Sequence, residues 1–404
     1  MKKILLVILG MLLIAALGYG VLFYWKNLRG AWFPLSKAPE DITKIINTTG
    51  MPLKLPPGFA ISIFAKDLVS PRVLAATPDG IIIASITSEG KVVALPDKNG
   101  DGVADEVITI LSGLNRPHGL AFKCQKNACS LYVAESNWIA MYDYDQNSFK
   151  ATFKNKITDL PNGGIHFTRT LGFSPDDRLY VSTGSDCNVC DEKDPLRAAI
   201  FSMNADGSDF KNVAKGLRNS VFFTWSPFDG KMWATEMGRD LLGDNLPPDE
   251  INIISAGKNY GWPICYGKNI HDTDFDPAPE QARYGAGKNA CAEFTPSYID
   301  IPAHSAPLGL AFIPKNNLPD EYRYNLLVAY HGSWNRTVPT GYKIVRYKLD
   351  AQGRNLGEED FISGWLSEKG VLGRPVDILI QQNGIIYISD DKAGVIYRVN
   401  YENI

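Results

Sequence analysis

The sequence lacks both an excess of basic residues and the short motifs that mark the most common enzyme classes. Its 41 Lys and Arg are balanced by 44 Asp and Glu, which gives a net charge of −3, whereas nucleic-acid-binding proteins are normally basic. No HExxH, Walker A, GxSxG or GxGxxG pattern occurs in the chain. These absences argue against nucleic acid as a partner and against the common zinc protease, NTPase, α/β-hydrolase and NAD-dependent classes.

The composition is that of a folded protein that is rich in turns. Hydrophobic residues make up 45% of the chain and charged residues only 21%, which excludes a disordered protein. The 36 Gly, 25 Pro and 11% aromatic residues favour β-structure over a helical bundle. The length alone would predict two or three domains of about 150 residues, but an internal repeat predicts one.

The N-terminus carries an apolar run of 22 residues, Ile4 to Trp25, which follows Lys2 and Lys3. About 20 such residues span a membrane, and the two lysines place the N-terminus in the cytoplasm. We therefore expect residues 1–26 to be an uncleaved signal anchor, residues 27–50 a linker, and the remainder to lie at the periplasmic face of the inner membrane. The alternatives are a cleaved signal peptide, for which the run lacks an Ala-x-Ala-like exit, and a buried core helix.

The six cysteines fit the oxidising compartment that such an anchor implies. Pairing neighbours in the sequence, one of about 15 possible connectivities, gives Cys124–Cys129, Cys187–Cys190 and Cys265–Cys291. The second pair also matches a redox C-x-x-C, but it lacks the strand-to-helix setting of a thioredoxin-like site. A structural staple is therefore favoured, and a four-cysteine zinc site would need a second close pair folded beside it.

One phrase recurs along the chain: an apolar strand, a turn of the Pro-Asp-Gly kind, and a second strand that resembles Leu-Tyr-Val-Ala. Its six copies begin at Leu74, Gly119, Leu171, Phe223, Gly309 and Asp377. Most copies are about 45–50 residues apart, the period of propeller blades, and insertions at 240–249 and 258–303 stretch the later spacings. Because a ring of blades buries faces that one blade cannot, we predict an all-β, six-bladed β-propeller over residues 51–404. A β-sandwich, the alternative, would not explain the repeat.

Aligning the six units places cationic and amide side chains just before the first strand, which lines the central channel of a propeller. The converging residues are Arg116, Arg218, Arg374, His166, Asn115 and Asn219, with Arg72 and Arg169 slightly further in. Like charges in one pocket repel unless an anion lies between them, and guanidinium groups suit carboxylates or phosphates. The alignment therefore predicts a compact polyanionic ligand at one mouth. Alternatively, these arginines pair with acidic loop residues, for which the candidates are Asp244, Asp249, Asp377 and Asp390.

Two stretches suggest calcium. The segment 97–105 offers oxygen ligands at the first, third, fifth and ninth positions of an EF-type loop, but its twelfth position is Ile108 rather than Glu. Its ligands would be Asp97, Asn99, Asp101 and Asp105, and a plain Asp/Gly turn is the alternative. The second stretch, residues 235–240 with 248–252, is acidic and lies at the mouth end of the fourth unit.

Taken together, these phrases resemble the soluble sugar dehydrogenases that depend on pyrroloquinoline quinone (PQQ), specifically the sorbosone dehydrogenase-like branch. The matching segments are 55–59, 116–122, 166–170, 185–190, 216–219, 249–252, 259–263, 331–336 and 373–377. Each segment is weakly specific, but together they run through all six units. The resemblance implies a PQQ- and calcium-dependent dehydrogenase that oxidises a sugar or sugar aldehyde. The three carboxylates of PQQ would then be the anionic groups that the arginine cluster binds.

The resemblance also implies roles by position. His166 matches a general base that takes the proton of a sugar hydroxyl while hydride passes to the quinone, and an unperturbed imidazole pKa of about 6.5 suits that role. Arg218 and Asn219 match the pair that contacts the quinone, and Arg374 matches a carboxylate-binding arginine. The matched metal ligands are the backbone carbonyls of Gly238 and Arg239 for a catalytic, Lewis-acid Ca²⁺, and Glu250 with Tyr260 for a structural Ca²⁺.

The chain departs from the glucose-oxidising relatives in ways that make glucose itself doubtful. Leu114 stands where they carry Gln, Arg239 where they carry Pro, and their Lys near Gly332 is missing. The residues that would bind the cofactor or fill these roles instead are Arg116, His118, His331, Trp334 and Arg336. The anchor suits electron delivery to a membrane acceptor. The competing hypotheses are a non-catalytic anchored propeller that binds a glycan or protein, and a Ca²⁺-dependent lactonase-type propeller, which would need several carboxylates on the axis.

Overall fold

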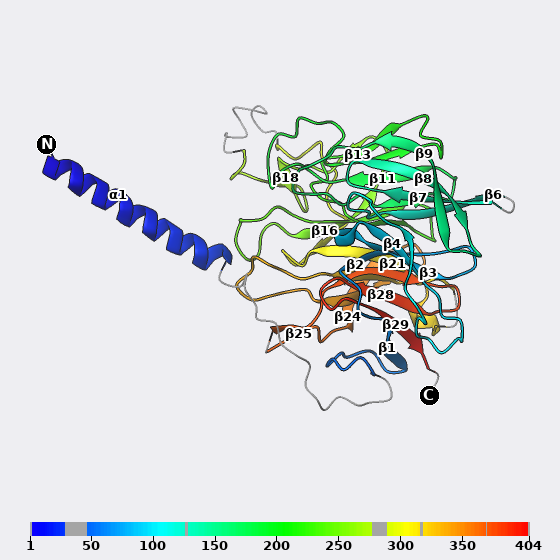
Figure 1. Cartoon of the computed structure of the whole chain (residues 1–404). Helices are drawn as coiled ribbons and strands as arrows, with labels where there is room; N and C mark the ends of the chain where they lie inside the picture. Colours follow the sequence, from blue (N-terminus) through cyan, green and yellow to red (C-terminus); the bar gives the residue numbers. More distant parts are fainter. Residues whose placement is uncertain are drawn as a thin grey trace.

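The computed structural model of the chain describes residues 2–28, 47–125, 128–276, 289–315, 318–368 and 370–402. Most of the expected linker, residues 29–46, lies outside the described residues. The apolar N-terminal run forms helix α1 (Lys2–Phe23) and a π-helical turn (Tyr24–Leu28), which extend away from the remaining body (Figure 1). Among the described residues, Ile8–Lys26 is the one helical segment long and apolar enough to cross a membrane, and it is unburied. The alternative of a buried core helix is therefore wrong.

Six antiparallel sheets, each led by one copy of the repeat, form the body (Figure 1). The first three sheets contain β2 (Pro71–Ala76), β3 (Ile82–Ile86), β4 (Lys91–Leu95) and β5 (Ile108–Leu111); β6 (Leu120–Gln125), β7 (Ala128–Ala134), β8 (Trp138–Asp145) and β9 (Lys150–Asp159); and β10 (Leu171–Phe173), β11 (Leu179–Thr183), β12 (Ala199–Met203) and β13 (Lys211–Lys215).

The fourth and fifth sheets contain β14 (Phe223–Trp225), β15 (Met232–Glu236), β16 (Asp249–Ile254) and β20 (Ile299–Ile301), then β21 (Pro307–Phe312), β22 (Leu326–Tyr330), β23 (Lys343–Leu349) and β24 (Asn355–Ile362). First strands of neighbouring sheets contact one another around the axis, as β2 contacts both β6 and β27. The prediction of an all-β, six-bladed propeller is confirmed.

The sixth sheet joins the two ends of the propeller. It contains β27 (Pro375–Ile380), β28 (Ile386–Asp390), β29 (Val395–Tyr401) and, as its outer strand, β1 (Phe59–Ala65). β1 runs antiparallel to β29, with Phe59 opposite Tyr401 and Ile61 opposite Val399. The last blade is therefore completed by the first strand, which the repeat alone did not predict.

The recurring turn explains why each unit starts as a hairpin. In the first blade, the Thr77 N–H donates to the Ile81 carbonyl and the Gly80 N–H donates to the Thr77 carbonyl. Gly80 adopts a φ of 91°, a left-handed conformation that glycine takes without a Cβ clash. The apolar residues on either side then alternate into cores between neighbouring sheets, and the Leu-Tyr-Val-Ala-like second strands are almost wholly buried.

The long insertions belong to the fourth blade. Residues 237–248 connect β15 to β16, and the β16–β20 connection contains β17 (Lys258–Asn259), β18 (Cys265–Tyr266) and β19 (Ile270–His271). β17 pairs in parallel with β13 of the third blade, so the insertion links the third and fourth blades. A further short hairpin, β25 (Leu366–Ser367) with β26 (Gly370–Val371), precedes the last blade, and two 3₁₀ turns span Thr87–Glu89 and Asp320–Tyr322.

All three expected disulfides are present, and no described cysteine is free. Cys124–Cys129 joins β6 to β7 across their hairpin, and Cys265–Cys291 fastens the long insertion. Cys187–Cys190 lies in the irregular segment that follows β11. The interpretation of Cys187-Asn-Val-Cys190 as a loop staple is confirmed, because no helix follows β11.

Candidate functional site

The residues that lead into alternate first strands are held by carboxylates at the ends of the second strands. Glu135 accepts the backbone N–H of Asn115, Glu236 accepts that of Asn219 at 2.7 Å, and Asp390 accepts that of Arg374 at 2.8 Å. These bonds occur in the second, fourth and sixth blades. They fix the backbone at the positions where the alignment placed its cationic and amide residues.

One cavity at the mouth, about 160 Å³ in volume, brings together residues from three blades. Of the predicted site residues it is lined by His166 from the third blade, Arg218, Asn219 and Gly238 from the fourth, and Trp334 from the fifth. The remaining lining residues are Met237, Asp240, Asp249, His304, Ala306 and Asn335, of which Asp249 was expected only as a possible partner of the arginines. Trp334 is 48% exposed and forms an aromatic edge of the opening.

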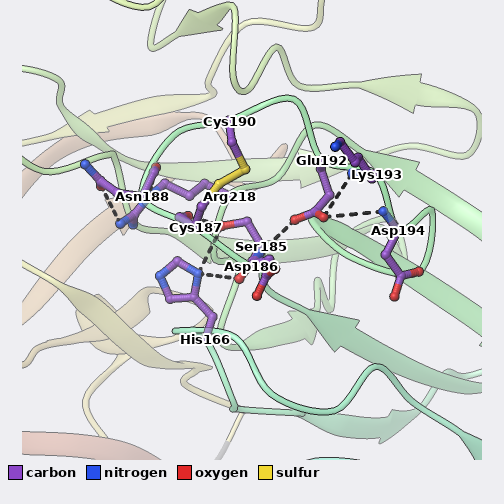
Figure 2. Close-up of a disulfide and its surroundings, with 10 residues drawn as sticks. All are labelled: His166, Ser185, Asp186, Cys187, Asn188, Cys190, Glu192, Lys193, Asp194 and Arg218. Carbon is purple, nitrogen blue, oxygen red and sulfur yellow. Dashed lines mark hydrogen bonds between the residues drawn. A yellow bond between two sulfur atoms is a disulfide. The ribbon is translucent and has the colours of Figure 1, made fainter.

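His166 is held through one ring nitrogen, and the other accepts no hydrogen bond from the described part of the chain. Its Nδ1 lies 3.0 Å from both the carbonyl oxygen and Oγ of Ser185. The Ser185 hydroxyl donates its own hydrogen to the Cys187 carbonyl at 2.7 Å, so both oxygens near Nδ1 act as acceptors and Nδ1 carries the proton. Nε2, on the side of the ring away from Ser185 (Figure 2), therefore keeps its lone pair.

The pKa of His166 departs from the ordinary value that the sequence suggested. Burial and, next, the Arg218 cation lower the pKa of His166 from 6.5 to about 3. A neighbouring cation disfavours a second positive charge, as does removal from water. In the protein without ligand, the imidazole is thus neutral throughout the physiological pH range, and these surroundings make it a weak base.

Arg218 is buried and almost fully hydrogen bonded. Its Nε donates to the Asn188 carbonyl at 2.8 Å, Nη2 donates to Asn188 Oδ1 and to Asp240 Oδ2 at 2.9 and 3.1 Å, and Nη1 donates to the Met237 carbonyl at 3.3 Å. A guanidinium has five N–H hydrogens. Within the described part of the chain, one hydrogen on Nη1 is therefore left for a ligand.

Asn219 supplies a polar atom without a protein partner. Its Oδ1 is buried and accepts no hydrogen bond from the described residues, which is costly unless a ligand or water is bound there. Gly184 allows this arrangement, because a Cβ at that position would lie 2.5 Å from Cβ of His166 and 2.7 Å from Oδ1 of Asn219. The sequence reasoning missed Gly184, although a glycine just before the matched segment 185–190 was a usable signal.

A second group of charged side chains contains two more of the predicted residues. Arg72 Nη1 lies 2.7 Å from Asp391 Oδ2, and His331 Nε2 lies 2.9 Å from Asp391 Oδ1. Arg374 donates from Nε to the His331 carbonyl at 3.1 Å and from Nη2 to the Gly332 carbonyl. Burial and Arg374 lower the pKa of His331 to about 4, against the opposing effect of Asp391. This Arg–Asp–His group does not line the cavity around His166.

Three predicted cofactor residues lie apart from the cavity. His118 is wholly buried against Phe222, and its Nε2 has no partner among the described residues. Arg116 is exposed, with its guanidinium carbon 5.0 Å from the centre of the Phe167 ring. Arg336 donates to the carbonyls of Asp244 and Ala303 and thereby holds the loops of two blades together.

Several mouth arginines do pair with carboxylates, but not with those expected. The pairs are Arg218–Asp240, Arg72–Asp391 and Arg239–Asp272. The four expected carboxylates, Asp244, Asp249, Asp377 and Asp390, instead accept backbone N–H groups. The charge of the mouth is thus partly neutralised by the protein itself.

Gly238 and Arg239 present backbone carbonyls suited to a hard cation. Gly238 donates its N–H to Asp249 at 2.9 Å, and neither carbonyl oxygen accepts a hydrogen bond from the residues described. Oxygen ligands of this kind are what Ca²⁺ prefers. Both residues also line a second, smaller cavity, which shares Arg218, Met237 and Gly238 with the first.

Glu250 and Tyr260 line that smaller cavity with Glu236. Glu250 accepts the Gly267 N–H at 2.6 Å and the Asn252 side-chain amide at 2.9 Å, and burial raises its pKa to about 7. The Tyr260 hydroxyl donates to the Ile253 carbonyl at 2.7 Å. Glu236 Oε2 has no partner among the described residues. The oxygen atoms that line this cavity could therefore ligate a cation, but they do not form a complete coordination shell.

The acidic loop 97–105 is arranged as a hydrogen-bonded turn. Asp97 accepts the N–H groups of Gly100, Asp101 and Gly102, and Asp105 accepts that of Lys98. The Asn99 and Asp101 side chains also accept backbone N–H groups. No cluster of three or more His, Cys, Asp or Glu side chains in the described ranges has the geometry of a metal site. These bonds define an Asp/Gly turn, and a Ca²⁺ ion at this loop stays a prediction.

The fold and the site together place the protein among the six-bladed β-propellers. In this one, a histidine and an arginine share a cavity at one mouth. Within that class, the profile of the TrAA12-like family matches residues 53–402, and the chain belongs to this family. An uncharacterized protein of Borreliella burgdorferi is 35% identical over 91% of this chain and 94% of its own length. A PQQ-dependent pyranose dehydrogenase of Coprinopsis cinerea is 25% identical, over 71% of this chain but only 44% of its own length.

Solved structures share the fold. The holo form of the PQQ domain of the Coprinopsis cinerea pyranose dehydrogenase has a TM-score of 0.72 at 21% identity and covers 88% of this chain and all of that domain. The PQQ-bound aldose sugar dehydrogenase of Streptomyces coelicolor has a TM-score of 0.60 at 19% identity and covers 86% of this chain and 99% of its own. The resemblance to PQQ-dependent sugar dehydrogenases is thus confirmed for family and fold.

Proposed function

We propose that the protein is a quinoprotein dehydrogenase that binds PQQ and Ca²⁺ at the mouth of the propeller and oxidises a sugar or sugar aldehyde. The observation that carries the proposal is the state of His166, a neutral imidazole with a free Nε2 in a cavity that it shares with Arg218 and Asn219. Membership of the TrAA12-like family and the PQQ-dependent relatives support it.

The residues present fit a cofactor with several carboxylates. PQQ, when bound, supplies a quinone that accepts a hydride. The Arg218 Nη1 hydrogen and the side chain of Asn219 would contact the quinone end, and Arg374, with Arg72 and His331 beside it, would face its carboxylates. The hydrogen bonds that Arg218 makes to the protein hold its guanidinium in one orientation, so little side-chain entropy is lost when the cofactor binds.

His166 would serve as the general base. Nε2 accepts the hydroxyl proton of the substrate while Ser185 keeps Nδ1 protonated. An anionic ligand in the cavity would raise the pKa of His166 above about 3, because opposite charge favours the imidazolium. Ligand binding would therefore strengthen the base in the same step that brings in the oxidant.

Calcium would bind to the carbonyls of Gly238 and Arg239 at the mouth, where a Lewis acid can polarise an oxygen of the bound quinone. Glu250 and Tyr260 would hold a second, structural Ca²⁺. Trp334 offers an aromatic face beside the opening, which suits a sugar ring. The absence of a C-x-x-C-H motif from the sequence leaves electron transfer to a separate acceptor.

We place the propeller at the periplasmic face of the inner membrane. Helix α1 is long enough to act as the anchor, and three disulfides suit an oxidising compartment. An acceptor dissolved in or bound to that membrane would lie within reach of an anchored enzyme. Secretion after cleavage of the helix is the alternative.

The test is titration of the detergent-purified protein with PQQ, with and without Ca²⁺, followed by dye reduction over aldoses, ketoses and sugar aldehydes. We expect Ca²⁺-dependent binding that Arg218→Ala weakens at least about 30-fold, since truncating one partner of a buried charge pair costs about 2–5 kcal/mol. His166→Ala should bind PQQ but lose about 10²- to 10⁴-fold in dye-reduction rate.

Arg218→Lys, which keeps the charge without the guanidinium fork, provides a second variant if Arg218→Ala does not fold. Arg354→Ala is the matched control, because Arg354 is an exposed residue on the β23–β24 turn. Failure to bind PQQ at any Ca²⁺ concentration would contradict the proposal and would favour a non-catalytic propeller that binds a glycan or protein.

A further inference from the structure

The segment Ser185–Cys190 contacts both His166 and Arg218, and one disulfide closes it (Figure 2). We propose that this disulfide-closed loop is a positioning element that sets the tautomer of His166 and the orientation of Arg218 together. Ser185 and Asn188 are its positioning residues. The inference rests on the proposed function for its catalytic consequence, but the arrangement it describes exists in the protein without cofactor.

The first contact is with the imidazole. Ser185 presents its carbonyl oxygen and Oγ to Nδ1 of His166, each at 3.0 Å. Oγ can only accept there because its hydrogen goes to the carbonyl of Cys187 at 2.7 Å. The tautomer of His166 therefore depends on where the Ser185 carbonyl and the backbone of Cys187, a disulfide residue, are held.

The second contact is with the guanidinium. Asn188 lies between the two cysteines and accepts from Arg218 twice, at its carbonyl oxygen (2.8 Å) and at Oδ1 (2.9 Å). The same Oδ1 accepts the Asp240 N–H at 2.8 Å, and the Asn188 amide donates to the Asp240 carbonyl at 3.1 Å. Asn188 thus fixes Arg218 and, with it, the loop of the fourth blade that carries Gly238 and Arg239.

The other hydrogen bonds of the loop among the described residues include those of Asp186, whose N–H donates to Glu192 at 2.8 Å and whose carbonyl accepts the Ile165 N–H at 3.3 Å. Residues 184–190 contain no regular secondary structure, so no strand ladder fixes their dihedral angles. The Ser185 N–H donates to the Arg218 carbonyl at 2.7 Å, which ties the start of the loop, and the Cys187–Cys190 bond ties its end. A short disulfide ring removes conformations that the open chain would populate.

The surroundings of the imidazole give the tautomer its importance. Arg218, Arg169 and Arg197 are the charged groups that act on His166, and all three disfavour a proton on it. Without a ligand, the imidazole therefore has two neutral forms. Only the form protonated at Nδ1 leaves Nε2 free to accept a substrate proton.

The experiment compares the full-length protein with Cys187→Ser plus Cys190→Ser, and uses Cys124→Ser plus Cys129→Ser as the matched control at the β6–β7 hairpin. Asn188→Ala, which keeps the disulfide, is a further variant in case the first does not fold. Ring ¹⁵N chemical shifts of His166, assigned with His166→Gln, report the tautomer in cofactor-free protein at neutral pH.

We expect the wild type and the control to show one tautomer protonated at Nδ1, and the Cys187/Cys190 variant to show a mixture. With PQQ and Ca²⁺ added, kcat for dye reduction should fall roughly 10- to 100-fold in that variant, because misplaced catalytic groups cost about this much. KM for the sugar should change little. Asn188→Ala should weaken PQQ binding while leaving the His166 tautomer as in the wild type.

An unchanged His166 spectrum in a folded Cys187/Cys190 variant would overturn the inference, as would an equal loss in the Cys124/Cys129 control. The proposed function is tested separately by PQQ binding and dye reduction of the wild type. If the wild type shows neither while the tautomer still shifts in the Cys187/Cys190 variant, the positioning element stands and the dehydrogenase assignment fails.

Discussion

At the residue scale, three histidines take different roles although the sequence placed them alike. His166 lines the cavity, His331 is bound by Asp391, and His118 is wholly buried. What separates them is the burial and the partner of each ring, which follow from the closure of six blades. The alignment placed His166 at the mouth and the resemblance assigned the other two to the site, but neither gave the direction of each side chain.

His118 should make the stability of the protein depend on pH. Burial lowers its pKa well below 6.5, so below that pH the unfolded chain binds a proton that the folded chain does not. Stability must then fall as pH falls, by about 1.4 kcal/mol per pH unit for one proton. His118→Gln should remove this contribution below about pH 6.

The measurement is denaturant unfolding of wild type and His118→Gln at several pH values. The difference between the two isolates His118, because all other titrating groups are shared. Parallel pH profiles for the two proteins would contradict the burial of a neutral imidazole at this position.

The pairing of mouth arginines shows where residue-level prediction ended. The alignment correctly brought Arg218 and Asn219 to the mouth with His166, because a repeat fixes the height of each residue on the axis. It could not choose Asp240 and Asp391 as the carboxylate partners, because both sit on loops whose paths depend on contacts between blades. The expected partners satisfy backbone N–H groups instead, a demand that is invisible in the sequence.

At the element scale, the recurring strand phrases were sufficient to predict the six blades. They did not predict how the first strand closes the ring. Each hairpin has a local signal, two apolar runs separated by a polar turn, and the structure has a sheet at every one of them. The pairing of β1 with β29 joins residues more than 300 positions apart, and no local pattern encodes it. β1 was therefore included in the domain without a partner being assigned.

Phe59 on β1 should be a main contributor to that closure. It is 1% exposed and packs edge-on against Tyr322, Phe361 and Tyr401. Phe59→Ala should lower the free energy of unfolding by about 3–5 kcal/mol, since the substitution leaves a cavity that the surrounding side chains cannot easily fill. Leu356→Ala on β24, where the side chain is 67% exposed, should change it by less than about 0.5 kcal/mol.

Guanidinium unfolding followed by tryptophan fluorescence would measure both variants. A small effect of Phe59→Ala, comparable to that of Leu356→Ala, would mean that β1 is dispensable for the stability of the ring.

At the scale of the whole molecule, the helix and the propeller are two separate elements with separate tasks. α1 extends outward (Figure 1) and its apolar side chains are exposed, while the residues that line the cavity around His166 all lie between 166 and 335. We expect the full chain to sediment with membranes and to resist extraction by salt. A chain lacking residues 1–28 should remain in the soluble fraction with its PQQ affinity unchanged.

Fractionation and immunoblotting would test this expectation. Release of the full chain by high salt would indicate surface adsorption, and a shortened mature protein in the periplasm would indicate that the helix is a cleaved signal.

The β1–β29 pairing also determines when the propeller can close during synthesis of the chain. β1, with the sequence Phe-Ala-Ile-Ser-Ile-Phe-Ala, leaves the ribosome long before its partner exists, and five blades must be made while it waits. An unpaired apolar strand edge is a template for intermolecular association. The nascent chain thus carries an aggregation-prone segment close to its N-terminus for nearly the whole of its synthesis. That segment must be kept from associating with other chains until the last blade has been made.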